Sequence, residues 1–180
     1  YNTPDFLIIA YQPKEKLLSK SVKINIKDIS NELEKLEKVN SVISILNVPL
    51  LESSNKTLAD LLTGIPTLED GIVDEESIRK ELTTSYIYKN NLVSEDFNTT
   101  AILINLNHNK KLANLREKKQ RYIELIEKKK LDEIELADYK VTLLSLSKER
   151  EQERNKQKQL VYQVREIINN YNETGDIYLG

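Results

Sequence analysis

The stretch Phe6-Leu7-Ile8-Ile9-Ala10-Tyr11 is an unbroken apolar run near the start of the chain, and Pro4 and Pro13 lie on either side of it. A short apolar run between such breakers is typical of a strand that is buried on both faces. We therefore predict that this run forms a central strand of a sheet.

The segment after this run has the spacing of an amphipathic helix, because apolar residues recur at steps of four and three. These residues are Val22, Ile26, Ile29, Leu33 and Leu36. A second strand is predicted over Ser41–Val48, and Pro49 ends it. A strand, a helix and a strand in this order indicate a crossover unit.

The region 49–97 is less regular, and short helices are predicted there at Thr57–Leu62 and Asp74–Leu82. The second of these has Asp74 as its expected N-cap. Thr99–Leu106 is rich in β-branched residues and predicts a strand, with which Leu92–Ser94 is expected to pair.

From Lys110 to Tyr171 the chain has no Gly or Pro and is densely charged, which predicts two long helical arms. Asp132 is the expected N-cap of the second arm. The first arm is short enough to pair only with the N-terminal half of the second. The polar run Ser147–Gln159 would then be an exposed neck, and Leu160–Tyr171 would pack on the sheet. Ile177–Leu179 is the predicted last strand.

This order of elements predicts an α+β protein with a ferredoxin-like split βαβ sheet and packed helices. The first and third strands would be central, and the first and last would be antiparallel neighbours. We assign residues 1–109 and 152–180 to this α+β body, which contains the irregular insert 49–97. Residues 110–151 would form an inserted long antiparallel helical hairpin.

Composition excludes several kinds of function. Lys and Arg total 27 against 29 Asp and Glu, so no basic excess exists for binding nucleic acid. There is no Cys, and His108 is the single His, which leaves little for thiol, Ser-His-Asp or zinc chemistry. We expect no catalytic residues, no metal and no cofactor, and no enzyme activity. The acidic residues near Asp74 are explained by a helix start.

Several blocks, taken in order, resemble the first extracytoplasmic loop of resistance-nodulation-division (RND) superfamily exporters, especially the MMPL-type branch. The blocks are Asp5–Pro13, Val39–Leu51, Pro66–Asp70, Tyr88–Asp96 with Thr99–Ala101, and Ile177–Gly180. The resemblance covers essentially the whole chain. The helical hairpin resembles an insertion that only some members carry.

The resemblance implies a periplasmic porter domain of a proton-driven inner-membrane exporter of hydrophobic or amphipathic substrates. Its partners would be the membrane helices and second extracytoplasmic loop of the transporter, hydrophobic small molecules or lipids, and another subunit or accessory protein at the hairpin. The proton-relay residues of the family lie in membrane helices, so none is carried onto this chain. The 180 residues would be a piece of a longer polypeptide.

Substrate contact, or an interface, is expected at the end of the second strand, at Asn47, Val48, Pro49 and Leu50. Two other functions remain open. One is a soluble protein-interaction module with a coiled-coil docking arm, and the other is a small enzyme on an α+β scaffold. The module has no flanking membrane helices, whereas the porter domain requires them.

Overall fold

The computed structural model describes residues 6–50, 67–68, 74–128, 130 and 132–180. The chain divides into two compact units, Tyr1–Asn107 with Gln163–Gly180, and His108–Tyr162. The predicted boundary at residue 151 stays a prediction. The elements are β1 (Phe6–Pro13), α1 (Lys20–Glu34), β2 (Val39–Ile43), α3 (Glu75–Thr84), β3 (Thr100–Leu106), α4 (Lys110–Glu127), α5 (Glu133–Asn169) and β4 (Gly175–Leu179).

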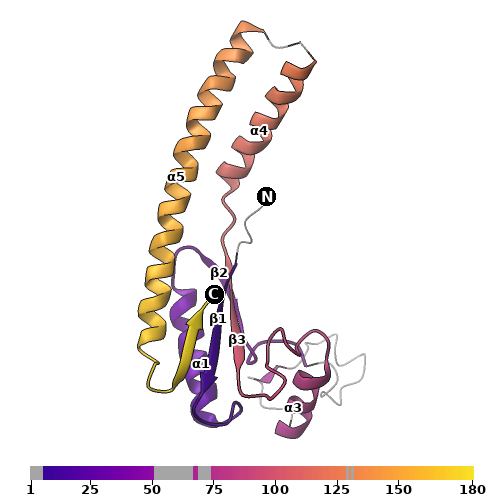
Figure 1. The fold of residues 1–180 in the computed structure, drawn as a ribbon, viewed down its shortest axis with the longest axis vertical. Coiled ribbons are helices and arrows are strands. Elements are labelled where there is room, and N and C mark those ends of the chain that lie inside the picture. Colours follow the sequence, from indigo (N-terminus) through magenta and orange to yellow (C-terminus); the bar gives the residue numbers. More distant parts are fainter. Residues whose placement is uncertain (1–5, 51–66, 69–73, 129, 131) are drawn as a thin grey trace. The chain divides into compact units, whose positions relative to one another are not determined.

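The protein is α+β, with one four-stranded antiparallel sheet in the order β2-β3-β1-β4 (Figure 1). The strands β1 and β3 are central, as the sequence predicts. The antiparallel pairing of β1 with β4 is also as predicted, and it sets Ile9 opposite Leu179.

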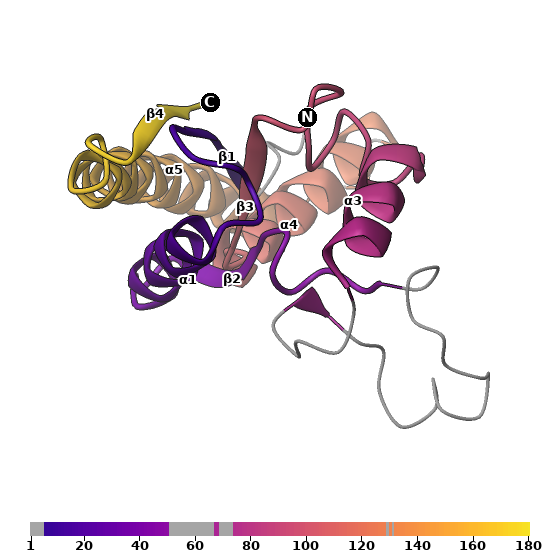
Figure 2. The same cartoon turned by 90° about the horizontal axis from the view of Figure 1, so that it is seen from below.

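One face of the sheet carries the core of the first unit. The strand β1 alternates, so that Ile9 and Tyr11 are fully buried while Phe6 and Ile8 are 41% and 39% exposed. The helix α1 and the last turns of α5 lie along the same face, as Figure 2 shows. The expectation that the first strand is buried on both faces is therefore wrong, because in the described part of the chain helices cover only one face.

The helix α1 begins at Lys20, with Ser19 as its N-cap. The Ser19 hydroxyl accepts a hydrogen bond from the Val22 amide. Its apolar stripe is buried as predicted as far as Leu33, and the helix ends at Glu34, before Leu36. The buried residues are Val22, Ile26, Ile29 and Leu33.

The second strand is shorter than predicted, because β2 ends at Ile43 and a turn follows. The Asn47 side chain stabilises this turn: its Oδ1 accepts from the Ser44 amide at 2.9 Å and its Nδ2 donates to the Val42 carbonyl at 2.8 Å. An asparagine that satisfies the backbone in this way competes with strand pairing, so the strand ends well before Pro49.

In the described residues between β2 and β3, the predicted helix cap is present, and the predicted strand pairing is reduced to a single bridge. Asp74 caps α3 by accepting from the Ser77 amide at 2.9 Å. Val93 pairs with Thr100 as an isolated antiparallel bridge, in place of a regular hairpin. The helix predicted at Thr57–Leu62 lies outside the described residues.

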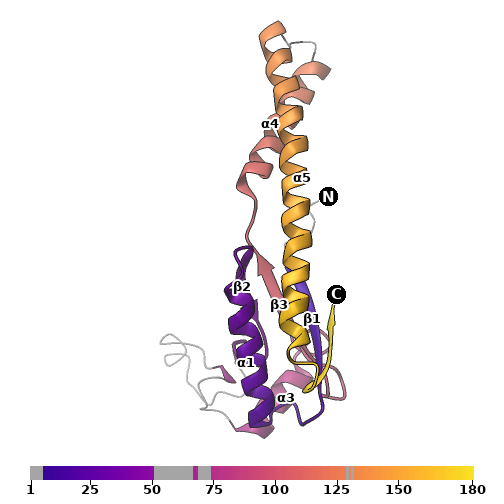
Figure 3. The ribbon, with the colours of Figure 1, turned by 90° about the vertical axis from the view of Figure 1, so that its left-hand side faces the viewer.

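The second unit contains α4 and most of α5 (Figures 1 and 3), which are joined by side-chain contacts at separate points. Near the α4–α5 connection, Asp138 receives hydrogen bonds from Lys118 at 2.7 Å and from Tyr122. Near the start of α4, Asn109 donates to both Glu149 and Glu153. Lys111, near the start of α4, contacts Glu149, whereas Lys118, further along α4, contacts Asp138, which is nearer the start of α5. The two helices therefore run antiparallel.

The polar run Ser147–Gln159 is exposed at most of its positions, as predicted, but Glu149 within it is buried and ion-paired to Lys111 at 2.7 Å. Asp132 caps α5 as predicted, since it accepts from the Glu135 amide at 2.7 Å while the Glu135 carboxylate accepts from the Asp132 amide. Within the described ranges, no helix is both long and apolar enough to cross a bilayer.

Candidate functional site

The candidate site lies on the sheet face opposite the core, which we call the open face. It consists of the alternate side chains that β-strand periodicity turns away from the core. The register sets Ile8 beside Leu103, Ala10 beside Ala101, and Ile43 beside Leu103. The strand β4 adds Tyr178 next to Ala10, and Tyr178 is 63% exposed. The open face is Phe6, Ile8, Ala10, Ile43, Ala101, Leu103 and Tyr178.

A cavity of about 240 Å³ lies on the open face. Its floor is formed by strand residues, and its wall comes from the turn after β2 and from the segment 87–92. The lining residues are Ile8, Ile43, Val48, Ile87, Tyr88, Asn91, Leu92, Ala101 and Leu103. The site is thus mainly aliphatic, with a phenol and an amide as its polar side chains.

Hydrogen bonds hold the wall of the cavity against the sheet. The Tyr88 hydroxyl donates to the Pro49 carbonyl at 2.5 Å, which joins the two parts of the wall. The Leu92 carbonyl accepts from the Ala101 amide at 2.8 Å and from the Thr100 hydroxyl at 3.0 Å. Burial, and then the nearby Glu81 carboxylate, raise the pKa of Tyr88 above its ordinary value. The phenol therefore stays a neutral hydrogen-bond donor at neutral pH.

The four residues predicted as substrate-path or interface residues lie at this wall but differ in position. Val48 is buried and lines the cavity, and Leu50 is fully buried. Asn47 and Pro49 are exposed. Asn47 stabilises the turn after β2, and Pro49 supplies the carbonyl that Tyr88 binds. Whether these residues contact a substrate stays a prediction.

The sequence reasoning did not identify the remaining lining residues. Ile8 and Leu103 lie in strands that are apolar at nearly every position, so their alternation gives no signal for which side is open. Ile87 and Asn91 lie in consecutive turns, where the Asn91 amide donates to the Ile87 carbonyl at 3.1 Å. No local pattern places such a segment over a particular strand.

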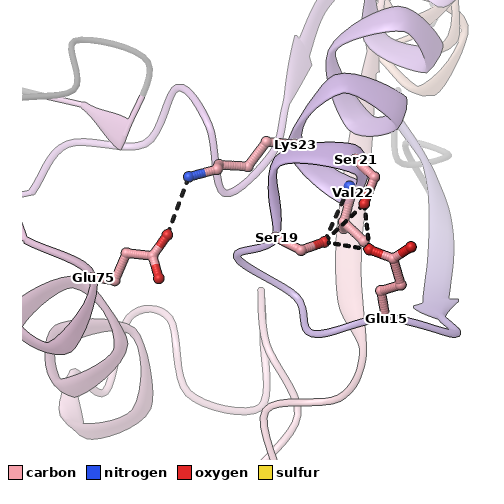
Figure 4. A network of polar contacts seen from close by, with 6 residues as sticks. All are labelled: Glu15, Ser19, Ser21, Val22, Lys23 and Glu75. Carbon is pink, nitrogen blue, oxygen red and sulfur yellow. Dashed lines mark hydrogen bonds and ion pairs between the residues drawn. The ribbon is translucent and has the colours of Figure 1, made fainter.

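A second cleft, of about 770 Å³, lies between the starts of α1 and α3 and the turn at 96–98. Figure 4 shows its edge, where Ser19 and Ser21 donate to the Glu15 carboxylate and Lys23 pairs with Glu75 at 3.3 Å. These serine hydrogen bonds lower the pKa of Glu15.

The lining of this cleft contains both cationic and anionic side chains. It includes Lys16 and Arg79 together with Glu75, Glu76 and Asp96. The Arg79 guanidinium lies 5.4 Å from the centre of the Phe97 ring, and Phe97 has a positive φ of 59°. Its cationic and anionic groups lie together, so the cleft has no clear preference for one charge.

In the described part of the chain, candidate residues for metal or acid-base chemistry are not brought together. His108 is exposed and precedes α4. No group of three or more His, Cys, Asp or Glu side chains suited to holding a metal ion occurs among the residues that the structure describes.

In comparisons with known proteins, no family model, no curated protein and no solved structure matches the chain.

Proposed function

We propose that this chain is the extracytoplasmic porter domain of a proton-driven RND-type exporter, close to the MMPL-type branch, and that its sheet is ferredoxin-like. In this role the domain lies on the periplasmic side of the bacterial inner membrane. It contributes to the path of hydrophobic or amphipathic substrates and contacts other parts of the transporter. It carries no catalytic residues, metal or cofactor of its own.

The observation that carries the proposal is the order of the sheet. The strands follow the order β2-β3-β1-β4, with α1 between β1 and β2 and α5 between β3 and β4. Two βαβ units that interleave in this way are the arrangement of ferredoxin-like domains. Porter subdomains of the RND superfamily are built on this arrangement, so the topology supports the resemblance.

The pairing of the first and last strands, β1 and β4, gives further support. The Gly180 amide donates to the Ile8 carbonyl at 2.9 Å, so the start of β1 and the end of β4 lie side by side. A loop between two neighbouring membrane helices must leave and re-enter the membrane at nearby points. The geometry of β1 and β4 meets this requirement, which other ferredoxin-like domains also meet.

The open face supports the transport role, because it offers an apolar surface that could accept an apolar substrate. Ile8 and Tyr178 are exposed there, and Val48 lines the cavity. Exposed contiguous apolar surface in a protein usually marks a binding site or an interface.

We further propose that residues 110–151 form an inserted helical hairpin that serves as a contact arm. Polar contacts between α4 and α5, at Asp138 and at Glu149, hold the two helices together. The helix α5 also leaves Ile134, Val141 and Leu144 exposed by 80%, 58% and 73%. Their spacing of seven and three residues is that of a coiled-coil seam.

The same seam favours the second candidate function, a soluble protein-interaction module with a coiled-coil docking arm. Under that function the seam binds a partner protein and the sheet is its platform. The two functions predict different parent genes, because a porter domain requires membrane helices on both sides of this chain and the module does not.

The test is the coding sequence on either side of this chain, followed by topology reporters fused at both ends. We expect a stretch of about 20 apolar residues on each side and a second, similar half in the parent. Reporter activity should place this domain outside the cytoplasm. Flanks without such stretches, or a cytoplasmic reporter signal, would reject the porter assignment and favour the module.

The contact arm has its own test in the parent protein. Ile134, Val141 and Leu144 are changed together to Ser, and Glu151, Arg154 and Lys158, exposed residues of the same helix, are changed together to Ser as the matched control. We expect loss of crosslinked partners in the first variant only. Unchanged partners and transport after deletion of residues 111–151 with a short linker would reject the arm.

A further inference from the structure

The cavity on the open face has the chemical character of a small apolar binding site. None of its nine lining residues is charged. The Tyr88 hydroxyl is engaged by the Pro49 carbonyl, so it does not require a ligand as partner. The Asn91 amide is exposed and is the other polar side chain of the lining. A charged group inside this cavity would find no counter-charge among these nine residues, which makes its burial costly.

The volume limits what the cavity accepts. A cavity of about 150 Å³ with aliphatic and aromatic walls holds benzene, whereas drug-sized ligands occupy sites of roughly 300–1,000 Å³. At about 240 Å³ the cavity lies between these limits. Scaling from benzene, it holds roughly six to ten carbon atoms, and a four-ring molecule such as a steroid is too large.

The cavity is also preformed and partly open. The Leu92 carbonyl is held by two groups of β3, and Tyr88 joins the wall to the turn after β2. Ile87 and Ile8 are 50% and 39% exposed. A ligand can therefore enter without breaking these hydrogen bonds, and burial of its apolar carbons provides the binding energy.

We propose that this cavity binds one aliphatic chain of roughly six to ten carbons, and that the polar end of the ligand stays in water near Asn91. This inference rests on the proposed function, because it treats the cavity as a binding site on the substrate path. Under the inference, the substrates are single-chain amphiphiles.

Methyl NMR on the 180-residue chain tests the proposal. Isoleucine δ1-methyl groups are labelled with ¹³C, and 1-octanol is added stepwise. We expect saturable shifts at Ile8, Ile43 and Ile87, which line the cavity. We expect no shifts at Ile26, in the core, or at Ile134, an exposed residue of α5.

A pair of matched variants locates the site. Ala101→Leu places extra carbons in the cavity, whereas Ala10→Leu adds the same group at the neighbouring position of the open face, outside the lining. We expect Ala101→Leu to weaken 1-octanol binding at least tenfold and Ala10→Leu to leave it within about twofold. Ile87→Asp changes an exposed position at low risk to folding, and it should weaken binding by a similar factor.

Three results would overturn the inference. The first is no saturable shift at the three cavity isoleucines. The second is equal binding by the Ala101→Leu and Ala10→Leu variants, and the third is binding of a steroid as tight as that of 1-octanol. These outcomes are separate from the test of the porter assignment, because that test reads the parent gene and its membrane topology, not binding to this cavity.

Discussion

The Tyr11 hydroxyl is the centre of a chain of hydrogen bonds that joins three elements of the first unit. Thr174 donates its hydroxyl proton to the Tyr171 carbonyl at 2.6 Å, so it accepts from Tyr11 at 2.9 Å. The Asn25 amide of α1 donates to Tyr11 at 3.4 Å. The Tyr11 ring is fully buried on β1. We predict that this chain of bonds holds the start of β4 against β1.

The cost of removing it follows from the geometry. Tyr11→Phe keeps the ring and loses one good and one long hydrogen bond, which should cost about 1–2 kcal/mol. Thr174→Val leaves the buried Tyr11 proton without its acceptor and should cost about 1–3 kcal/mol. Both variants remove the same hydrogen bond. The double variant should therefore lose about 1 kcal/mol less free energy of unfolding than the two single variants lose in sum.

The assay is urea unfolding followed by circular dichroism, with amide hydrogen exchange as a local readout. The amides of Lys14 and Gly180 report directly, because they bind the Thr174 and Ile8 carbonyls at 3.0 and 2.9 Å. Tyr178→Phe is the matched control on an exposed tyrosine and should change the free energy of unfolding by less than about 0.5 kcal/mol. Equal effects of Tyr11→Phe and Tyr178→Phe, or additive single variants, would refute the reasoning.

Three further predictions concern other parts of the chain. Gly175→Ala should cost about 1–3 kcal/mol, measured as a lower Tm, because an added Cβ would lie 2.3 Å from the Gln12 carbonyl oxygen; an unchanged Tm would contradict this. Asn47→Ala should cost about 1–2 kcal/mol, since two hydrogen bonds to the backbone are lost, and should shift the Val48 methyl signals; unmoved signals would argue against the turn as a support of the cavity. The Lys111 ammonium, and then the Asn109 amide, lower the pKa of Glu149. The stabilisation that this gives is therefore present above about pH 4.5 and is lost as the pH falls below it. Carboxyl NMR should show the pKa rising in Lys111→Met, and an unmoved pKa would count against the ion pair.

The elements with strong local signals were predicted well. The stripe of α1 and the caps at Asp74 and Asp132 depend on contacts within one or two turns, which neighbouring residues determine. The central position of β1 and β3 follows from their apolar content, because central strands lose the most contact with water.

The candidate site depended on long-range structure. Val48 was among the predicted residues, but Ile87 and Asn91 reach the cavity through contacts between distant segments, among them the hydrogen bond from Tyr88 to Pro49 across 39 positions of the chain. A hydrogen bond between residues so far apart in the chain produces no periodic pattern in the sequence from which it could be predicted. The pairing of Asn109 with Glu149 and Glu153 escaped prediction for the same reason, since a polar run reads as solvated unless its partner is known.

The sequence by itself determined which segments become helices and strands, because capping and apolar periodicity act between residues close along the chain. Tertiary structure alone decided which side of the sheet stays open. The strands β1 and β3 are apolar on both sides, so either side could have faced the core. The side that carries Ile9 and Tyr11 became the core because α1 lies against it, and the opposite side was left to form the cavity.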